Sequence, residues 1–501
     1  MPTPLPSFPT SSRIIQGGMG IGVSSWRLAR AVAMNGEIGV VSGTSIDTVV
    51  VRELQDGDPN HRRRVLADYP DQEIVRHLVN QYYVEGGRRP DAAYRLLPLH
   101  RFRPTRTSQR ILSAATYSEV RLAKEDHDGY VGINLLCELK RFTLAGLYGA
   151  MLADVDAVMM GAGVPLEEAR QLPLLAEGRP ARLRLEVDTS QADGDVGPFY
   201  YELDPADLVE TVRPVRPPDF FPIISSDVLA RVLDAKLPDG CISAWIIEGS
   251  TAGGHNAPPR NKGVDENGDP IYDERDLPDL ERVAALGYPF FLAGGYGTPE
   301  KLCEAIDLGA AGVQIGSLFS LADESGYPAS YKRRLIRQIH ERRITVRTDG
   351  RISPTGFPFK VVELEETNGV PTIHAKRQRH CDLGYLQQAY VDGKGRLLAR
   401  CPAEPVDDYI RKGGRIEDTD RRGCLCNGLM ANIGLGQIQV WGEERPLFTG
   451  GDELSDLPLG SAENPSYSAA DVIAFLRGPH GMLDAHGTSV HRAIAHRTGR
   501  Y

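Results

Sequence analysis

Short apolar stretches recur along the chain, and each one ends in small or polar residues. Eight of them begin at Ile14, Ile38, Tyr130, Ala157, Phe221, Ser243, Pro289 and Ala311. They are continuous apolar runs rather than alternating patterns, as expected for strands that are buried on both faces of a parallel sheet. Helical patterns follow most of them. In the helix predicted after the seventh run, Thr298 stands at the N-cap position and Pro299 at the first helical position.

Eight buried strands that alternate with helices predict an α/β fold, a (β/α)8 TIM barrel, with its site on the loops that follow the strands. The alternative is a doubly wound dinucleotide-binding fold, because GGMGIG from Gly17 resembles a dinucleotide loop. That fold needs an acidic residue at the end of the second strand to hold the ribose. The second strand here ends in Ser42-Gly43-Thr44, with nothing acidic before Asp47. The sequence therefore favours the barrel.

The spacing between the predicted strands is uneven. Residues 45–129 and 176–220 are too long for simple connections, and we interpret them as insertions or lids. The barrel pattern stops near Ile344. We therefore predict a catalytic barrel domain over residues 1–343 and an appended C-terminal extension over residues 344–501, whose last clear helix lies in SYSAADVIAFLRG, from Ser466.

Composition and charge narrow the classes of function. The 501 residues contain no run of about 18 apolar residues that could span a bilayer, which excludes a membrane protein. The net charge of -10 disfavours nucleic-acid binding, which depends on a basic face. The first residues, MPTPLPSFPTSS, lack the basic and apolar regions of a signal peptide, and the odd number of seven cysteines suits a reducing cytoplasm. We expect a cytoplasmic protein with a small-molecule substrate, and a homo-oligomer is compatible with these features.

The loops after the seventh and eighth strands are rich in glycine. LAGGYGTPE places Gly294 and Gly295 just before a helix, and VQIGSLF repeats the arrangement with Gly316 and Ser317. Backbone N–H groups at such turns form an anion cradle, and barrels commonly hold a phosphate on these two loops. The alternative is that both loops are simple helix-starting turns. Two of them at consecutive strand ends favour a phosphate site.

A second group of candidate residues follows the sixth strand in EGSTAGGHNAPPR, which runs from Glu248 to Arg260. Gly253 and Gly254 let the backbone approach a flat ligand closely. They place His255 at the catalytic face, where an imidazole can donate or accept a proton near neutral pH. We therefore predict His255 and Glu248 as catalytic residues.

These motifs carry a resemblance to a known family. QGGMGIG, GINLL, MGAG, EGSTAGGHNAPPR, LAGGYGTPE and VQIGSLF, in this order over about residues 14–319, resemble the nitronate monooxygenase (2-nitropropane dioxygenase) family. That family is related to FMN-dependent enoyl-ACP reductases. The later motifs SPTGFPFK, CDLGYL, RCPAEP and CLCNGL resemble its long subgroup. Glu248 departs from the short enzymes, which carry glutamine there.

The resemblance implies a non-covalent FMN and oxidation of a nitronate, or a related small anion, with O2. It implies that the isoalloxazine lies against Gly17, Gly18, Met19, Asn134 and Gly253. It implies that the ribityl phosphate is held by Gly294, Gly295, Gln314, Gly316 and Ser317. The alternative within the family is an enoyl-thioester or quinone reductase that uses NAD(P)H, and the alternative outside it is a non-redox barrel that binds a phosphorylated metabolite.

The extension holds a third candidate site, in Cys381, Cys401, Cys424 and Cys426. Four cysteines in a short segment without clear periodicity suggest a module stapled by a metal, either Zn2+ or, less favoured, an iron–sulfur cluster. Their spacing is not a standard C-x2-C pair, and four reduced thiols remain the alternative. Cys137, Cys241 and Cys303 lie on strand or helix patterns and are expected in the core.

Overall fold

The computed structural model describes residues 8–99, 102–192 and 194–478. Eight parallel strands form its central sheet, in the order β1-β11-β10-β9-β8-β4-β3-β2. Backbone hydrogen bonds from Gln16 N–H to the Ile38 carbonyl (2.9 Å) and from Ile38 N–H to the Ile14 carbonyl (3.1 Å) join the first strand to the start of the second. The sheet is therefore closed, and the predicted (β/α)8 barrel is confirmed. Its strands are β1 (Ile14–Gln16), β2 (Gly39–Ser42), β3 (Val131–Leu136), β4 (Ala157–Gly161), β8 (Asp219–Ile224), β9 (Trp245–Glu248), β10 (Phe290–Ala293) and β11 (Gly312–Ile315).

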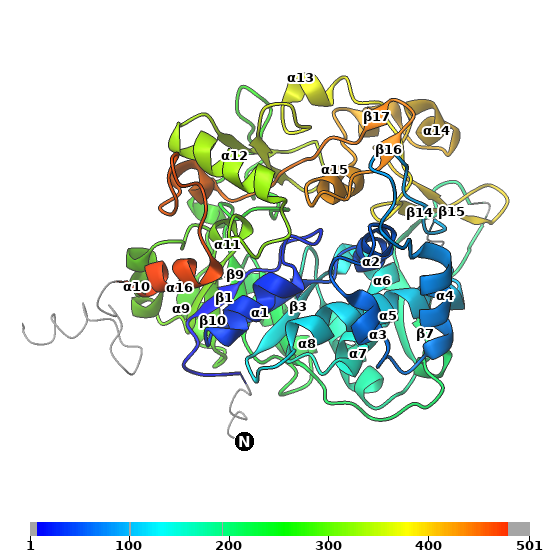
Figure 1. Ribbon diagram of the computed structural model, residues 1–501, viewed down its shortest axis with the longest axis horizontal. Helices are drawn as coiled ribbons and strands as arrows, with labels where there is room; N and C mark the ends of the chain where they lie inside the picture. The colour runs from blue at the N-terminus through cyan, green and yellow to red at the C-terminus, as the bar shows by residue number, and fades with distance from the viewer. Residues whose placement is uncertain (1–7, 100–101, 193, 479–501) are drawn as a thin grey trace, which may run out of the picture.

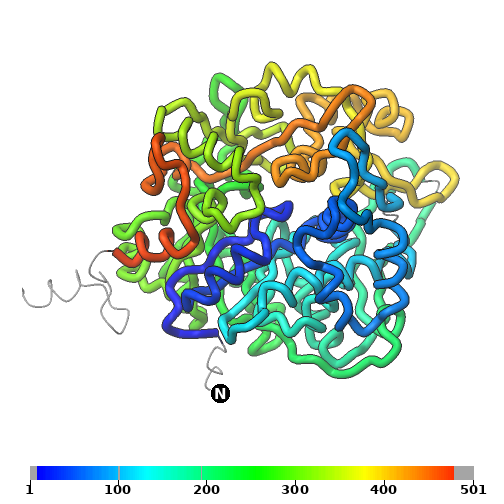
Figure 2. The backbone as a smooth tube through the Cα atoms, in the orientation of Figure 1, coloured from blue at the N-terminus to red at the C-terminus, as the bar shows by residue number. Residues whose placement is uncertain are grey.

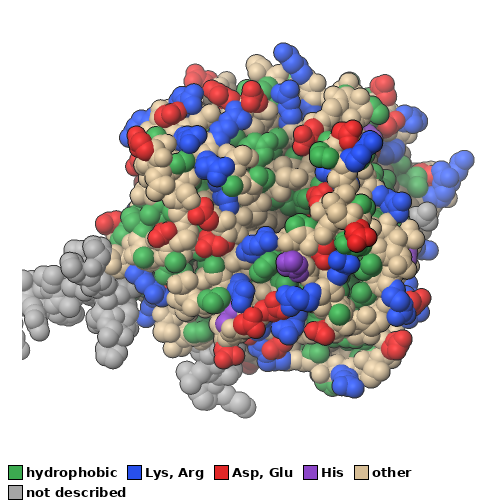
Figure 3. Space-filling view, in the orientation of Figure 1, with side chains coloured by type: hydrophobic (Ala, Val, Ile, Leu, Met, Phe, Trp, Pro, Cys, Tyr) green, Lys and Arg blue, Asp and Glu red, His purple; other side chains and the backbone are tan. Residues whose placement is uncertain are grey.

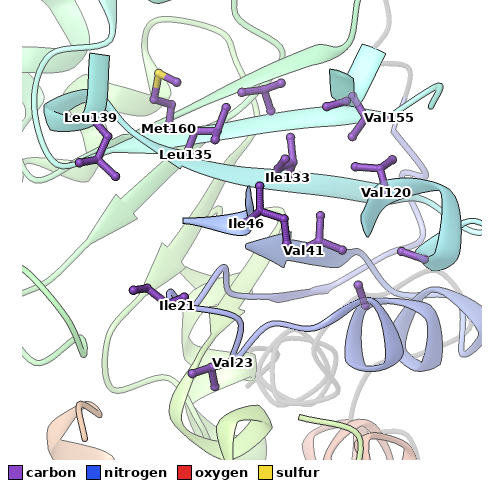
Figure 4. Packing of buried hydrophobic residues seen from close by; sticks show 14 of the residues in the cluster. Ile21, Val23, Val41, Ile46, Val120, Ile133, Leu135, Leu139, Val155 and Met160 are labelled. Carbon is purple, nitrogen blue, oxygen red and sulfur yellow. The ribbon is translucent and has the colours of Figure 1, made fainter. Parts of the chain in front are cut away.

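Helices cover the outside of the barrel because their apolar faces pack on the strands. Figure 4 shows this packing: Val41 and Ile133 on neighbouring strands lie near Ile46 and Val120, which come from helices. The Thr298 side chain accepts a hydrogen bond from the N–H of Lys301, which confirms the predicted N-cap. The helices that follow barrel strands are α1 (Trp26–Met34), α6 (Lys140–Leu152), α7 (Leu166–Ala176), α8 (Asp227–Lys236), α9 (Leu280–Ala284), α10 (Pro299–Asp307), α11 (Ser317–Ser320) and α12 (Ala329–His340).

The two long connections have different structures. The first is helical and holds α2 (Ile46–Gln55), α3 (Arg62–Leu66), α4 (Gln72–Tyr82) and α5 (Arg106–Ala123). The second contains an antiparallel pair, β5 (Ala181–Leu185) with β7 (Phe199–Leu203), and the short strand β6 (Val187–Asp188). Short 3-10 turns lie at Cys137–Leu139, Pro205–Asp207 and Glu274–Asp276.

The segment after α12 lies along one side of the barrel, where Figures 1 and 2 draw it in yellow and orange. Its last helix confirms the helix expected from Ser466, with Ser468 as its N-cap. Its elements are β12 (Thr345–Asp349), β13 (Phe359–Glu363), α13 (Pro371–His374), β14 (Gln388–Val391), β15 (Leu397–Arg400), α14 (Val406–Arg411), α15 (Leu425–Ala431), β16 (Ile438–Gln439), β17 (Gly442–Glu443) and α16 (Ala469–Arg477), with 3-10 turns at Ile416–Thr419 and Asp452–Asp456.

This extension is bonded to both insertions. Strand β14 pairs in parallel with β6 of the second insertion. The Tyr385 hydroxyl is 2.7 Å from the Thr48 hydroxyl and donates to the Asp47 carboxylate (2.5 Å), both on α2 of the first insertion. Apolar residues of barrel and extension belong to one continuous buried cluster. The extension therefore packs as part of the same body as the barrel. Over the described ranges, the helices are all too short or too polar to cross a membrane.

Candidate active site

A large pocket lies at the carboxyl ends of the barrel strands, with about 1440 Å³ of empty space including its open mouth. The barrel supplies one wall of it and the extension supplies the other. In Figure 3 the surface is hollowed in this region, below the position of α15, and hydrophobic side chains line the hollow. The predicted site residues found in the wall are Gly17, Gly18, Met19, Asn134, Glu248, Gly253, His255, Gly294, Gln314, Gly316 and Ser317. Gly295 lies beside Thr251, next to this wall.

The loop after β1 approaches β3 so closely that only glycine fits. A Cβ atom on Gly18 would lie 2.0 Å from the Cβ of Asn134, and one on Gly17 would lie 3.3 Å from Cγ of Gln314. The Oε1 atom of Gln314 is buried and has no hydrogen-bond partner among the described residues. A smooth backbone surface beside an unsatisfied amide oxygen suits a flat ring that carries its own hydrogen-bond donor. These residues fit the isoalloxazine of FMN.

The turn after β10 also depends on glycine. Gly294 and Gly295 have φ values of +85° and +78°, a region that other residues avoid. A Cβ on Gly294 would lie 3.0 Å from the backbone N of Ala252 and from the Thr251 hydroxyl. Ser317 follows β11, and its hydroxyl accepts a hydrogen bond from the N–H of Gly451 (2.9 Å) in the extension. The two loops thus lie next to each other at the pocket, and the extension is bonded to one of them; that they hold a phosphate stays a prediction.

Glu248 ends strand β9 and faces the pocket. Burial raises the pKa of its carboxyl to about 7, and no neighbouring charge contributes to that shift. A carboxyl with this pKa exchanges its proton at neutral pH, which is what general acid–base catalysis requires. Glu248 thus lies at the predicted place in the pocket, and its catalytic role stays a prediction.

His255 also lines the pocket. Its Nε2 is 2.7 Å from the Ser353 hydroxyl, and its ring packs edge-on against Phe359. Burial lowers the pKa of His255 to about 4, so the imidazole is neutral at physiological pH. Because Ser353 engages Nε2, the other ring nitrogen is the one that a bound molecule can use. His255 is therefore a neutral hydrogen-bonding group rather than a protonated imidazolium.

The extension contributes pocket residues that the sequence did not predict. They come from the segment before β14, from α15, from the 3-10 turn Asp452–Asp456 and from the loop that precedes this turn. The motifs around them were visible in the sequence, but nothing in their spacing indicated that they face the barrel. These residues are Tyr385, Leu386, Leu425, Cys426, Leu429, Thr449, Gly450 and Glu453.

A second cavity adjoins the first and shares Glu248 and His255 with it. Its wall includes Val164, Leu229 and Pro258, and it also includes the charged side chain of Arg260. Two cavities that meet at the same two titratable residues provide room for a cofactor on one side and for an elongated substrate on the other.

The four cysteines of the extension lie close enough to affect one another electrostatically. The thiol of Cys424 is in hydrogen-bond contact with Cys426, and Cys381 and Cys401 raise the pKa of Cys426. None of the four forms a disulfide. Within residues 8–99, 102–192 and 194–478, His, Cys, Asp and Glu side chains form no group of three or more that could hold a metal ion. The sequence correctly grouped these cysteines, but the predicted metal site is unsupported.

Of the three expected core thiols, Cys137 and Cys303 are buried and Cys241 is half-buried.

Residues 219–396 match the family model described as nitronate monooxygenase. They cover strands β8 to β11, and with them Glu248, His255 and both cradle loops. Over this segment the chain is similar to the nitronate monooxygenases. A nitronate monooxygenase of Pseudomonas aeruginosa is 29% identical over 210 residues, which are 42% of this chain and 52% of that relative.

A second curated relative comes from Mycobacterium tuberculosis. It is (3aS,4S,5R,7aS)-5-hydroxy-7a-methyl-1-oxo-octahydro-1H-indene-4-carboxyl-CoA dehydrogenase, and it is 32% identical over 131 residues, 25% of this chain and 32% of the relative. The chain thus spans between a third and a half of the length of these two curated relatives. Among solved structures, FabK from Thermotoga maritima is 15% identical with a TM-score of 0.47, covering 93% of this chain and 91% of its own. A nitroalkane oxidase from Streptomyces ansochromogenes is 15% identical with a TM-score of 0.44, covering 94% and 95%.

Proposed function

We propose that this protein is an FMN-dependent oxidoreductase of the nitronate monooxygenase type, which oxidises a nitronate or a related small anion with O2. One observation carries the proposal: a carboxyl with a pKa near 7 and a neutral imidazole both face a pocket built from close-packed glycines. The match of residues 219–396 to the family model supports it.

The flavin, when bound, supplies the electron-transfer chemistry that protein side chains lack. The polypeptide binds and orients the reactants. Protonated Glu248 donates a hydrogen bond to an oxygen of the anionic substrate, whereas the ionised carboxylate repels that anion. His255, held by Ser353, offers a hydrogen bond without adding charge. The apolar residues of the extension exclude water from the pocket.

A second candidate function is reduction of an acyl thioester at the expense of NAD(P)H. The adjoining cavity favours it, because Arg260 lies in its wall and can pair with the anionic end of an elongated substrate. The relative that acts on a CoA ester supports this candidate too. In that reaction Glu248 would give a proton to the reduced substrate, so the two functions use the same carboxyl differently.

Spectra and one substitution separate the two candidates. The purified protein is expected to show flavin absorbance, and a flavin-free folded protein would contradict both. Under anaerobic conditions we expect a nitronate to bleach the flavin faster than NADPH does. Rapid bleaching by NADPH with no response to nitronate would favour the thioester reductase.

The variant Glu248→Gln gives a second readout. Glutamine is permanently neutral and can still donate a hydrogen bond. For the wild type, kcat/KM with a nitronate should fall as pH rises through about 7, because the carboxyl loses its proton there. Glu248→Gln should keep this activity and lose the pH dependence. In a thioester reductase the same variant cannot give the proton, and turnover should fall roughly 100-fold or more.

A further inference from the structure

Glu453 lies at the Ser317 end of the anion cradle. It precedes Leu454 in the 3-10 turn Asp452–Asp456 and lines the pocket from the extension side. Its carboxylate is in hydrogen-bonding range of the Ser317 hydroxyl and of the backbone N–H groups of Gly297 and Ser317, and these contacts lower its pKa. Ser317 is one of the residues expected to hold the phosphate of the cofactor, and Gly297 lies in the same glycine-rich loop as Gly294 and Gly295. A carboxyl side chain of this protein is therefore aimed at the proposed phosphate site.

The contact is close but incomplete. A Cβ atom placed on Gly297 would lie 2.8 Å from Oε2 of Glu453, so the carboxylate touches the loop directly. Oε2 is nevertheless buried without a hydrogen bond of standard geometry to any described residue. Burial is the largest influence on this side chain, and it raises the pKa of Glu453. A carboxylate held in this way occupies the donors without being firmly anchored to them.

The surroundings do not compensate this charge. Lys360 is bonded to the neighbouring Asp452 at 2.6 Å, and the Asp452 charge raises the pKa of Glu453 further. Glu453 also raises the pKa of Tyr467, whose hydroxyl donates a hydrogen bond to the Leu318 carbonyl (2.8 Å). Tyr467 is neutral at physiological pH and so does not offset the charge of Glu453. A phosphate that enters the cradle therefore meets a second anion beside the same N–H groups.

We propose that Glu453 is an internal competitor for the cofactor's phosphate, which must give up the Ser317 and Gly297 donors before FMN can bind fully. The proposal rests on the flavin-binding function proposed above. It explains why a cradle of backbone N–H groups also contains a carboxylate. In this proposal the contribution of the phosphate to FMN affinity depends on Glu453, whereas the contribution of the isoalloxazine is independent of Glu453.

The test compares FMN with riboflavin, which has the same ring and no phosphate. Dissociation constants are measured by flavin fluorescence on flavin-free wild type, Glu453→Gln and Asp456→Asn. Asp456→Asn is the matched control, because it removes one negative charge from an exposed position of the same turn. Glu453→Gln should bind FMN about tenfold more tightly than wild type, and riboflavin equally well. Asp456→Asn should match the wild type with both ligands.

The pH dependence gives a second measurement. Because protonation removes the competing charge, wild-type affinity for FMN should rise as pH falls, and Glu453→Gln should show no such rise, since glutamine does not titrate and protonation of the phosphate only weakens its hydrogen bonds. Equal FMN affinity in wild type and Glu453→Gln would overturn the proposal, and so would weaker FMN binding by the variant, since Glu453 would then support the cradle. Failure of all three proteins to bind either flavin would instead contradict the proposed function.

Discussion

The two walls of the pocket are built by different means. The barrel wall is rich in glycine: Gly18 and Gly294 are glycine because neighbouring atoms lie 2.0 and 3.0 Å from where a Cβ would be. The extension wall consists of side chains such as Tyr385, Cys426 and Glu453. The two walls therefore offer a bound molecule different groups: the barrel offers closely approached backbone, and the extension offers side chains. We predict that substitutions in the barrel wall act mainly on cofactor affinity and that substitutions in the extension wall act mainly on the groups around the cofactor.

The largest effect, on FMN affinity, should come from a substitution in the barrel wall. Gly294→Ala forces a Cβ against the backbone of Ala252 in a residue with a φ of +85°. Because overpacking of this kind costs about 1–3 kcal/mol, FMN affinity should fall about tenfold to hundredfold, measured by fluorescence titration. Gly309→Ala is the control, since Gly309 has a φ of +90° and nothing within 4 Å of its Cβ position. Similar FMN loss in both variants would mean that backbone strain, rather than the cradle, is responsible.

A smaller effect, on turnover, is expected where the barrel wall and the extension wall of the pocket meet. Ser353 of the extension holds Nε2 of His255, and its hydroxyl is also 2.9 Å from that of Thr355. Ser353→Ala should lower kcat about tenfold, because the imidazole loses its orientation, while FMN affinity stays unchanged. His255→Ala should lose more turnover and still retain flavin. If Ser353→Ala lost flavin instead, the extension wall would be needed for cofactor binding at this point, which would contradict the predicted difference between the two walls.

The smallest effect should be on stability alone. Tyr385 bonds the extension to α2 through Asp47 and Thr48. Tyr385→Phe removes this hydroxyl without changing the shape of the side chain, and the free energy of unfolding should fall by about 1 kcal/mol. Urea unfolding with unchanged slope measures this loss. If instead FMN affinity changed strongly, the extension would contribute to cofactor binding beyond Glu453.

The barrel could be predicted from the sequence because its determinants are local. Each buried strand is a continuous apolar run, and each cradle loop is a short glycine motif, so Gly294 and Ser317 could be identified without knowing the fold. The partners of these loops could not. Ser353 is about a hundred positions from His255, and Glu453 is farther still from Gly297; no local pattern links them. The cysteine cluster was recognised by type, but residue type alone cannot fix the distances that a metal requires.

The pairing of β6 with β14, and the closure of the cradle by Gly451, have a consequence for how the protein is made. All eight barrel strands have been synthesised once residue 315 is added, but Glu453 follows much later. At about 5–20 residues per second, the ribosome needs on the order of 10 to 30 seconds for that stretch. During this interval the phosphate cradle has neither its competitor nor its cover. In terms of the two proposals above, the loops of the flavin site are therefore synthesised well before the residue that we propose as their competitor.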